Sequence, residues 1–201
     1  MYNNLRSGDN WFGIAVIPGK SLLVFCSLSY TMTYGTKDGG AFSIRNPVLL
    51  IACVILTNLA GVAGSFFTDT GTGGSWYADE LIKPWFVPPD EVFPIAWTTI
   101  FILMGIALYL VLGEGTGRTD VQIAVFLFFC QLGLNILWSY LFFTLKSPLF
   151  GFIEIIILWI FILAVTVSFY RINKRAGYLF LPYLAWVSFA TVLTGTIYLL
   201  N

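Results

Sequence analysis

The sequence predicts an all-α membrane protein: a bundle of five transmembrane helices with a folded loop between the first two. Three observations predict this class. Of the 201 residues, 58% are hydrophobic and only 10% are charged, and the mean hydropathy of +0.86 lies outside the range of soluble proteins. The apolar residues form five runs, each long enough for the roughly 20 residues that a bilayer span needs. An aromatic, proline-rich segment separates the first two runs.

The composition also excludes several classes of function. The formal net charge is zero, so no electrostatic argument supports a nucleic-acid partner. The chain has no histidine, which excludes a Ser-His-Asp triad, a histidine-bound metal and a histidine-ligated haem. Cys26, Cys53 and Cys130 lie in apolar runs without metal-ligand spacing, and we interpret them as small hydrophobic residues. We predict no catalytic residue and no metal site.

The first 45 residues are predicted to be an extension, separate from a transmembrane domain of residues 46–201. Their one apolar run, residues 21–34, is too short for the roughly 20 residues of a span. A signal-like segment after Lys20 is an alternative, although no small-x-small cleavage pattern follows it. We favour an interfacial or disordered extension.

The five predicted spans follow in order. They are residues 46–67, 92–112, 121–144, 148–170 and 178–201. In the first span, Ala60 and Gly64 form a small-xxx-small pair that lets two helices approach closely. We favour ordinary packing within the bundle for this pair. A wall thinned for a ligand or for a second protomer is the alternative.

The loop before the second span, residues 76–91, is predicted to be folded, and we call it the lid. Asp79 and Glu80 are expected to begin a short helix. Lys83 and Pro84 are expected to end it, because proline disfavours helical geometry in the residue before it. The prolines that follow stiffen the chain. The residues assigned to the lid are Trp76, Tyr77, Lys83, Pro84, Trp85, Pro88 and Pro89.

The end of the lid is expected to start the second span. Asp90 and Glu91 place acceptors and negative charge at the helix start, where free backbone N–H groups and the helix dipole favour them. Pro94 suits a first helical turn. The lid should therefore be a rigid aromatic cover that delivers Trp97 into the membrane.

Polar residues recur on one face of the third span. Gln131, Asn135, Trp138 and Ser139 follow a helical spacing. Because polar groups in hydrocarbon are costly, this face should point inward. Glu154, in the fourth span, is interpreted as a hydrogen-bonded structural carboxyl. A proton or cation relay is the alternative.

The basic residues predict the orientation. With five spans, eight of the ten lysines and arginines fall on the amino-terminal side of the membrane, and only Lys83 and Lys146 fall on the other. The positive-inside rule then places the N-terminus inside and the C-terminus and the lid outside.

Several ordered motifs resemble the TspO/translocator protein family, also called the peripheral-type benzodiazepine receptor or tryptophan-rich sensory protein family. They occur in the lid, in the third span and in the fifth span, so the resemblance covers about residues 46–201. The matching residues are Trp76-Tyr77, Leu81, Lys83-Pro84-Trp85, Pro88-Pro89, Val92-Phe93, Trp97, Gln131, Leu134-Asn135, Trp138, Phe142-Phe143, Pro182-Tyr183, Trp186, Phe189-Ala190 and Leu193.

This resemblance implies a five-helix bundle, commonly a homodimer, with a pocket beneath the lid. Members of the family bind porphyrins such as protoporphyrin IX and haem as ligands rather than cofactors, and also benzodiazepine drugs. The implied role is a receptor or carrier in tetrapyrrole transport or stress-linked regulation. The implied pocket residues are Phe93, Trp97, Asn135, Trp138, Trp186, Ala190 and Leu193.

Two other functions remain as alternatives. A light- or oxygen-dependent porphyrin-degrading enzyme is implied by some bacterial relatives, and a structural membrane scaffold would explain the apolar bundle but not the lid. The sterol motif of the family is incomplete, because Leu193-Thr194-Gly195 replaces Leu-Asn-Tyr and Leu199 stands where an arginine is expected. We therefore make no prediction about cholesterol binding and do not expect a steroidogenic role.

Overall fold

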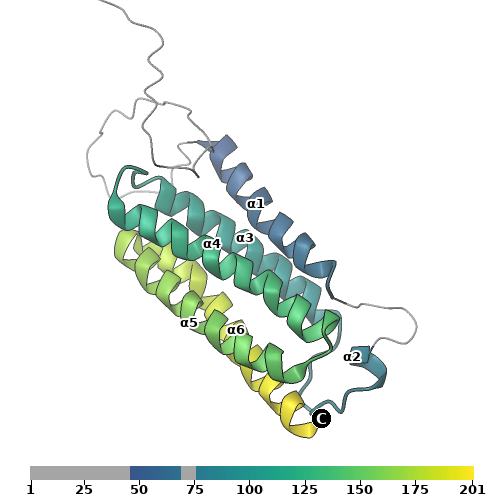
Figure 1. Ribbon diagram of the computed structural model, residues 1–201. Coiled ribbons are helices and arrows are strands. Elements are labelled where there is room, and N and C mark those ends of the chain that lie inside the picture. The colour runs from purple at the N-terminus through teal and green to yellow at the C-terminus, as the bar shows by residue number, and fades with distance from the viewer. Residues whose placement is uncertain (1–45, 69–75) are drawn as a thin grey trace, which may run out of the picture. The chain divides into compact units, whose positions relative to one another are not determined.

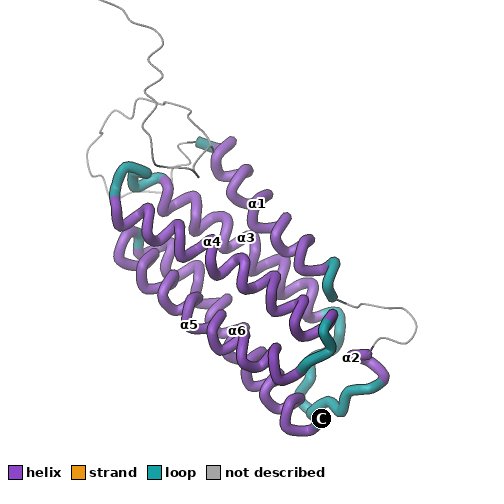
Figure 2. Tube along the Cα trace, viewed as in Figure 1, coloured by secondary structure: helices purple, strands orange, loops and turns teal. Residues whose placement is uncertain are grey.

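Five long helices make up most of the described chain, and Figure 1 shows how they are arranged. The computed structural model describes residues 46–68 and 76–201, and the predictions made for residues 1–45 lie outside them. The elements are α1 (Pro47–Ser65), α2 (Trp76–Asp79), α3 (Val92–Leu112), α4 (Thr119–Ser139), the π-helical η1 (Tyr140–Thr144), α5 (Pro148–Ile172) and α6 (Lys174–Leu200). Helices and loops account for all of the described residues (Figure 2).

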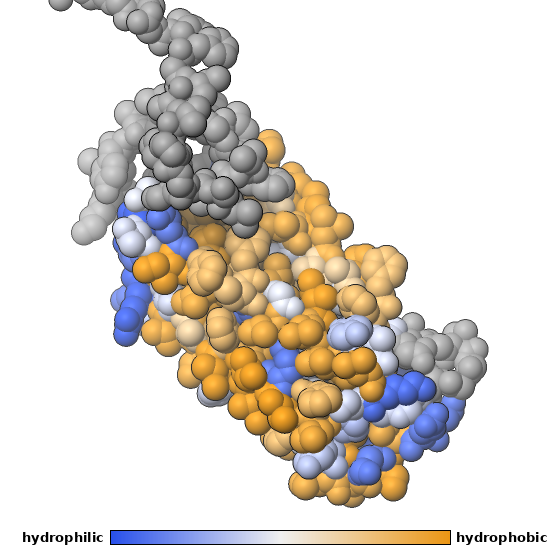
Figure 3. All heavy atoms as spheres, in the orientation of Figure 1, coloured by the Kyte–Doolittle hydropathy of each residue, from blue (hydrophilic) through white to orange (hydrophobic). Residues whose placement is uncertain are grey.

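The prediction of five membrane spans is confirmed. Five helices of the described chain, with η1 continuing α4, are long and apolar enough to cross a bilayer. They form a closed ring of neighbours, in which α1 packs on α3, α3 on α6, α6 on α5, α5 on α4, and α4 on α1. Hydrophobic residues cover most of the visible face of these helices, and hydrophilic residues gather mainly toward the two ends (Figure 3).

Two helices begin with the same local device, an N-cap side chain followed by proline. The Asn46 side chain accepts a hydrogen bond from the Leu49 N–H (3.1 Å) at the start of α1. The Ser147 hydroxyl accepts from the Phe150 N–H (3.4 Å) at the start of α5. Each cap satisfies a backbone donor that has no partner within its helix, and the proline that follows loses no hydrogen bond.

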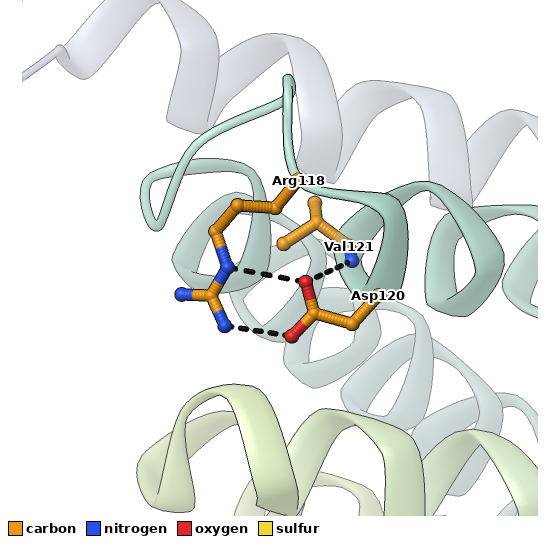
Figure 4. Close-up of polar contacts among 3 residues, drawn as sticks. All are labelled: Arg118, Asp120 and Val121. Carbon is orange, nitrogen blue, oxygen red and sulfur yellow. Dashed lines mark hydrogen bonds and ion pairs between the residues drawn. The ribbon is translucent and has the colours of Figure 1, made fainter.

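The start of α4 uses an acid instead of a neutral cap. The Asp120 carboxylate accepts from the Val121 N–H (3.0 Å) and forms an ion pair with Arg118, with Nη2 and Oδ2 2.6 Å apart (Figure 4). Both side chains are about half exposed, so the ion pair adds little stability. The negative charge at the helix start is its more useful property, because the helix dipole favours it there.

Asn173 joins α5 to α6. Its Oδ1 accepts from the N–H groups of Arg175 (3.0 Å) and Ala176 (3.3 Å), and its Nδ2 donates to Glu114 Oε1 (2.8 Å) in the turn that follows α3. This cap lets α6 begin at Lys174, four residues before the predicted start at residue 178. The sequence prediction was wrong here because the basic residues were interpreted as a turn.

We expect Asn173→Ala to lower the free energy of unfolding by about 1–2 kcal/mol, because two backbone N–H groups lose their acceptor. Thermal unfolding followed by circular dichroism in detergent micelles would measure the change. Asn173→Ser is the matched control, since serine retains the cap and loses only the bond to Glu114. Equal destabilisation by both variants would contradict the capping role.

The contact between α1 and α3 depends on a missing side chain. A Cβ on Gly105 would lie 2.6 Å from Val54 Cα and 2.9 Å from Thr57 Oγ1. At the same level, the Thr57 hydroxyl donates to the Phe101 carbonyl oxygen (2.7 Å). In a membrane, such close backbone approach and interhelical hydrogen bonding replace the hydrophobic effect as the source of association.

The small-xxx-small pair of α1 also packs within the bundle. Ala60 and Gly64 are buried, and a Cβ on Gly64 would lie 3.5 Å from the Ser139 hydroxyl of α4. The favoured interpretation, ordinary packing, is therefore confirmed. The opposite face of α1 exposes a stripe of large apolar side chains: Val48, Ile51, Ile55, Leu59 and Val62.

Candidate functional site

The lid folds against the end of the bundle at which α6 finishes (Figure 1). Its one helical turn, α2, begins at Trp76 and ends at Asp79, so Asp79 lies at the end of the helix and not at its start as expected. After α2, the Val87 N–H donates to the Pro84 carbonyl oxygen (3.2 Å) and closes a turn. A short helix was correctly predicted, but its position was predicted three residues too late.

The predicted side-chain cap of the second span is wrong. Glu91 occupies the cap position of α3 but makes no capping hydrogen bond with its side chain. Backbone carbonyls of the lid act in its place, with Pro89 accepting from Val92 (3.0 Å) and Asp90 from Phe93 (3.3 Å). The chain therefore enters α3 through a continuous series of turns, and no acidic side chain is needed as acceptor.

Aromatic side chains of the lid pack on η1 and α6. The ring of Trp76 meets Phe142 edge to face with centroids 5.8 Å apart, and Tyr77 meets Phe143 at 5.7 Å. On the other side, Phe86 meets Phe189 of α6 at 6.4 Å. These are the favoured geometries of aromatic pairs, so the lid is attached by ring packing on two sides.

A polar clamp also fastens the lid. The Asn201 side chain accepts from the Ile82 N–H (2.9 Å) and donates to the Ile82 carbonyl oxygen (3.1 Å) and to that of Ile197 (2.9 Å). A side-chain amide can pair with a peptide group in this way because it carries both a donor and an acceptor. The sequence contained no signal for this contact, since the two residues are far apart along the chain.

Asn201→Ala should loosen the middle of the lid. We expect hydrogen exchange at the Ile82 amide to become roughly fivefold faster, because a partly exposed hydrogen bond contributes about 1 kcal/mol. Thr196→Val serves as the control, since the Thr196 hydroxyl donates to the Val192 carbonyl oxygen of its own helix. Unchanged exchange in Asn201→Ala would show that the ring contacts alone hold the lid.

Two predicted lid residues have different surroundings. The Lys83 ammonium lies 4.6 Å from the centre of the Tyr77 ring, a cation–π contact. Burial raises the pKa of Tyr77, and the negative charge of Asp90 raises it further, so the phenol remains uncharged. Trp85, by contrast, is 94% exposed and meets the Phe86 ring edge to face, with centroids 5.8 Å apart.

The predicted pocket residues fall into two adjoining groups. Phe93, Trp138 and Leu193 belong to the aromatic cluster beneath the lid, together with the buried Phe142. Trp138 stacks on Phe142 with centroids 5.2 Å apart and ring planes 13° from parallel. Trp138 also packs on the main core, so it connects the two groups.

The second group packs on the main core of the bundle, and its members are Trp97, Trp186 and Ala190. Trp97 stacks on Phe101 (5.7 Å) and meets Tyr183 edge to face (6.2 Å). The two groups are joined where Phe93 meets Trp186 at 5.9 Å. Each of these rings thus packs against at least one other ring, and a planar ligand would have to separate some of these pairs.

A hydrogen-bond chain crosses the interior beside these rings. Asn135 Nδ2 donates to the Tyr183 hydroxyl (3.1 Å), which in turn donates to Gln131 Oε1 (3.1 Å). All three side chains are buried. The expectation that Gln131 and Asn135 face inward is confirmed. Tyr183 was not assigned to the site, although it belongs to the matching Pro182-Tyr183 motif, which was a usable signal.

Two hollows lie along α5 and α6. The first has a volume of about 380 Å³, and its lining includes Phe152, Gly195 and Tyr198. The second, of about 290 Å³, is lined by Ile156, Trp159, Ser188 and Thr191. Trp159 Nε1 donates to the Ser188 hydroxyl (2.7 Å), which gives this tryptophan a structural role between the two helices.

Known proteins share the sequence of most of this chain. The sequence profile of the TspO/MBR family matches residues 53–200. The tryptophan-rich protein TspO of Chlorobaculum tepidum is 47% identical over 152 residues, which is 76% of this chain and 95% of that protein. A protein of the same name from Archaeoglobus fulgidus is 44% identical over 156 residues, 78% of this chain and 99% of that protein. The human protein named translocator protein is 34% identical over 137 residues, 68% of this chain and 80% of that protein. The chain is therefore a multi-pass integral membrane protein and belongs to the TspO/MBR family.

Proposed function

We propose that the protein is a membrane receptor or carrier for porphyrins, such as protoporphyrin IX and haem, and for other flat aromatic ligands of the benzodiazepine type. Its role would lie in tetrapyrrole transport or stress-linked regulation. Family membership supports a membrane receptor or transport role. The observation that carries the proposal is the set of aromatic rings beneath a folded lid, next to a buried polar chain.

The chemistry of these side chains suits a planar guest. Indole and phenyl rings offer flat apolar faces for offset stacking, and a few buried polar groups would fix the orientation of the guest. Trp138 is the central residue of this proposal, because it contacts both the lid cluster and the main core. Phe142, now stacked on Trp138, is the ring that a ligand would replace.

Trp138→Ala should weaken the binding of protoporphyrin IX by at least about tenfold, because a stacking partner and its buried area are lost. Quenching of tryptophan fluorescence in a titration of the purified protein would measure the affinity. Trp159→Ala is the control, since it also removes one tryptophan but from the surface between α5 and α6. If the native protein shows no saturable quenching, the receptor proposal fails and the scaffold interpretation gains support.

We also propose that two copies form a homodimer within the membrane. Ala60 and Gly64 are buried within a single chain, so they are not available as its contact. The exposed apolar stripe on α1, which includes Ile51, Ile55 and Leu59, is a surface that lipid or a second copy could cover. Light scattering in detergent would test the dimer: we expect the mass of a dimer for the native protein and the mass of a monomer for Ile55→Lys.

A further inference from the structure

Four buried side-chain atoms of the described chain have no hydrogen-bond partner: Gln131 Nε2, Trp138 Nε1 and both carboxyl oxygens of Glu154. They come from the facing helices α4 and α5. Gln131 is 0% exposed and Glu154 is 4% exposed. Buried polar groups are almost always paired, and an ionisable group within a membrane span is a candidate functional residue.

Helix register places Glu154 level with Trp138. A Cβ on Gly151 would touch the Phe142 side chain at 2.7 Å, so these two positions face each other across the contact between α5 and η1, which continues α4. The two helices are antiparallel because only a short turn joins them. One turn further along α5 is Glu154, and one turn back along α4 is Trp138. Glu154 and Trp138 thus lie at a similar level along the two helices, and their polar side-chain atoms do not bond to each other.

The unpaired atoms include both donors and acceptors, and this limits the kinds of ligand group that can pair with all of them. A bare cation would leave the indole N–H of Trp138 without a partner, and a simple anion would leave the Glu154 oxygens without a donor. A carboxyl or carboxamide group meets both needs, because it carries an acceptor oxygen and either carries or shares a proton. One proton held between Glu154 and a ligand carboxyl also avoids two adjacent negative charges in the membrane.

We propose that Glu154 and Trp138 Nε1 form a polar subsite for a carboxyl or carboxamide group on the ligand. This inference rests on the proposed function and deepens it, since the propionic acid side chains of a porphyrin are groups of this class. Glu154 accepts or shares the proton of the ligand group, and the Trp138 indole donates to its oxygen. The aromatic side chains bind the flat face of the ligand, and the polar subsite determines which edge of the ligand enters the bundle.

Protoporphyrin IX and its dimethyl ester are matched probes, because the ester keeps the ring and loses the acid group. We expect the native protein to bind the acid roughly tenfold more tightly than the ester, the effect of about one well-placed hydrogen bond to a buried acid. Glu154→Leu should abolish this preference. Glu154→Gln should retain much of it, since an amide both donates and accepts. Thr166→Val is the control, because Thr166 is a buried polar position nearer the C-terminal end of α5. This variant should bind both probes as the native protein does.

The outcomes separate the two proposals. If Glu154→Leu keeps the native preference for the acid, the ligand carboxyl binds elsewhere and the subsite is wrong. Equal binding of acid and ester by the native protein also overturns the subsite but leaves porphyrin binding intact. Binding of neither probe overturns both proposals. Glu154→Leu should fold normally, because removing an unpaired buried carboxyl is not costly, and its thermal unfolding in detergent checks this directly.

Discussion

Gly105→Ala should destabilise the bundle by about 2–3 kcal/mol, although alanine is the better helix former. The added Cβ would lie 2.6 Å from Val54 Cα, which is backbone and cannot rotate away. Helices α1 and α3 must therefore separate, and the hydrogen bond from Thr57 to the Phe101 carbonyl lengthens with them. Overpacking of about 1–3 kcal/mol and the weakened hydrogen bond outweigh the gain of about 1 kcal/mol in helix propensity.

Gly133→Ala is the matched control for this prediction. A Cβ on Gly133 in α4 would meet no atom within 4 Å, so only the gain in helix propensity remains. This variant should be neutral or more stable by up to about 1 kcal/mol. Unfolding by a denaturing detergent, monitored by helical circular dichroism, compares the two. Changes of the same sign in both variants would show that close approach of α1 and α3 is not what Gly105 provides.

Tyr183→Phe should lower the free energy of unfolding by about 2–4 kcal/mol. The hydroxyl accepts from Asn135 and donates to Gln131, and its loss leaves both buried amides with unpaired groups. Each buried group left unpaired costs about 1–3 kcal/mol. The ring contact of Tyr183 with Trp97 is retained by phenylalanine, so the change isolates the hydroxyl.

Tyr198→Phe provides the comparison for Tyr183. Tyr198 lies near the end of α6, is partly exposed, and stacks on Phe152 at 6.1 Å. Phenylalanine keeps this stacking, so stability should change by less than about 0.5 kcal/mol. The same unfolding assay serves for both variants. A stable Tyr183→Phe protein would mean that water or a rearranged amide satisfies Gln131 and Asn135.

The sequence was most informative about the membrane-spanning segments. A span in hydrocarbon must satisfy its own backbone and present apolar side chains, so the length of each apolar run almost determines the helix. The predicted second span, residues 92–112, agrees with α3 at both ends. The starts of α4 and α6 lie earlier than predicted because polar residues can form the first turn of a helix once a cap such as Asn173 is present.

The sequence was less informative about contacts between distant residues. The polar face of Gln131 and Asn135 could be predicted because both lie on one helix, four residues apart. Their link to Tyr183 could not, since it depends on how α4 and α6 are rotated toward each other. The clamp between Asn201 and Ile82 could not be predicted for the same reason, because it depends on how the lid packs against the end of α6.

The sequence by itself determined the number of spans, the inward polar face and the family, because hydrophobicity and short motifs are local properties of the chain. Only the tertiary structure decided that Trp138 stacks on Phe142 and that Gly105 lets α1 approach α3 closely. It also showed that the interpretation of Glu154 as a hydrogen-bonded carboxyl was wrong, because neither of its oxygens has a hydrogen-bond partner among the described residues. These features depend on the order, rotation and register of neighbouring helices. Many sequences with the same hydrophobic pattern could pack differently, so the pattern cannot specify them.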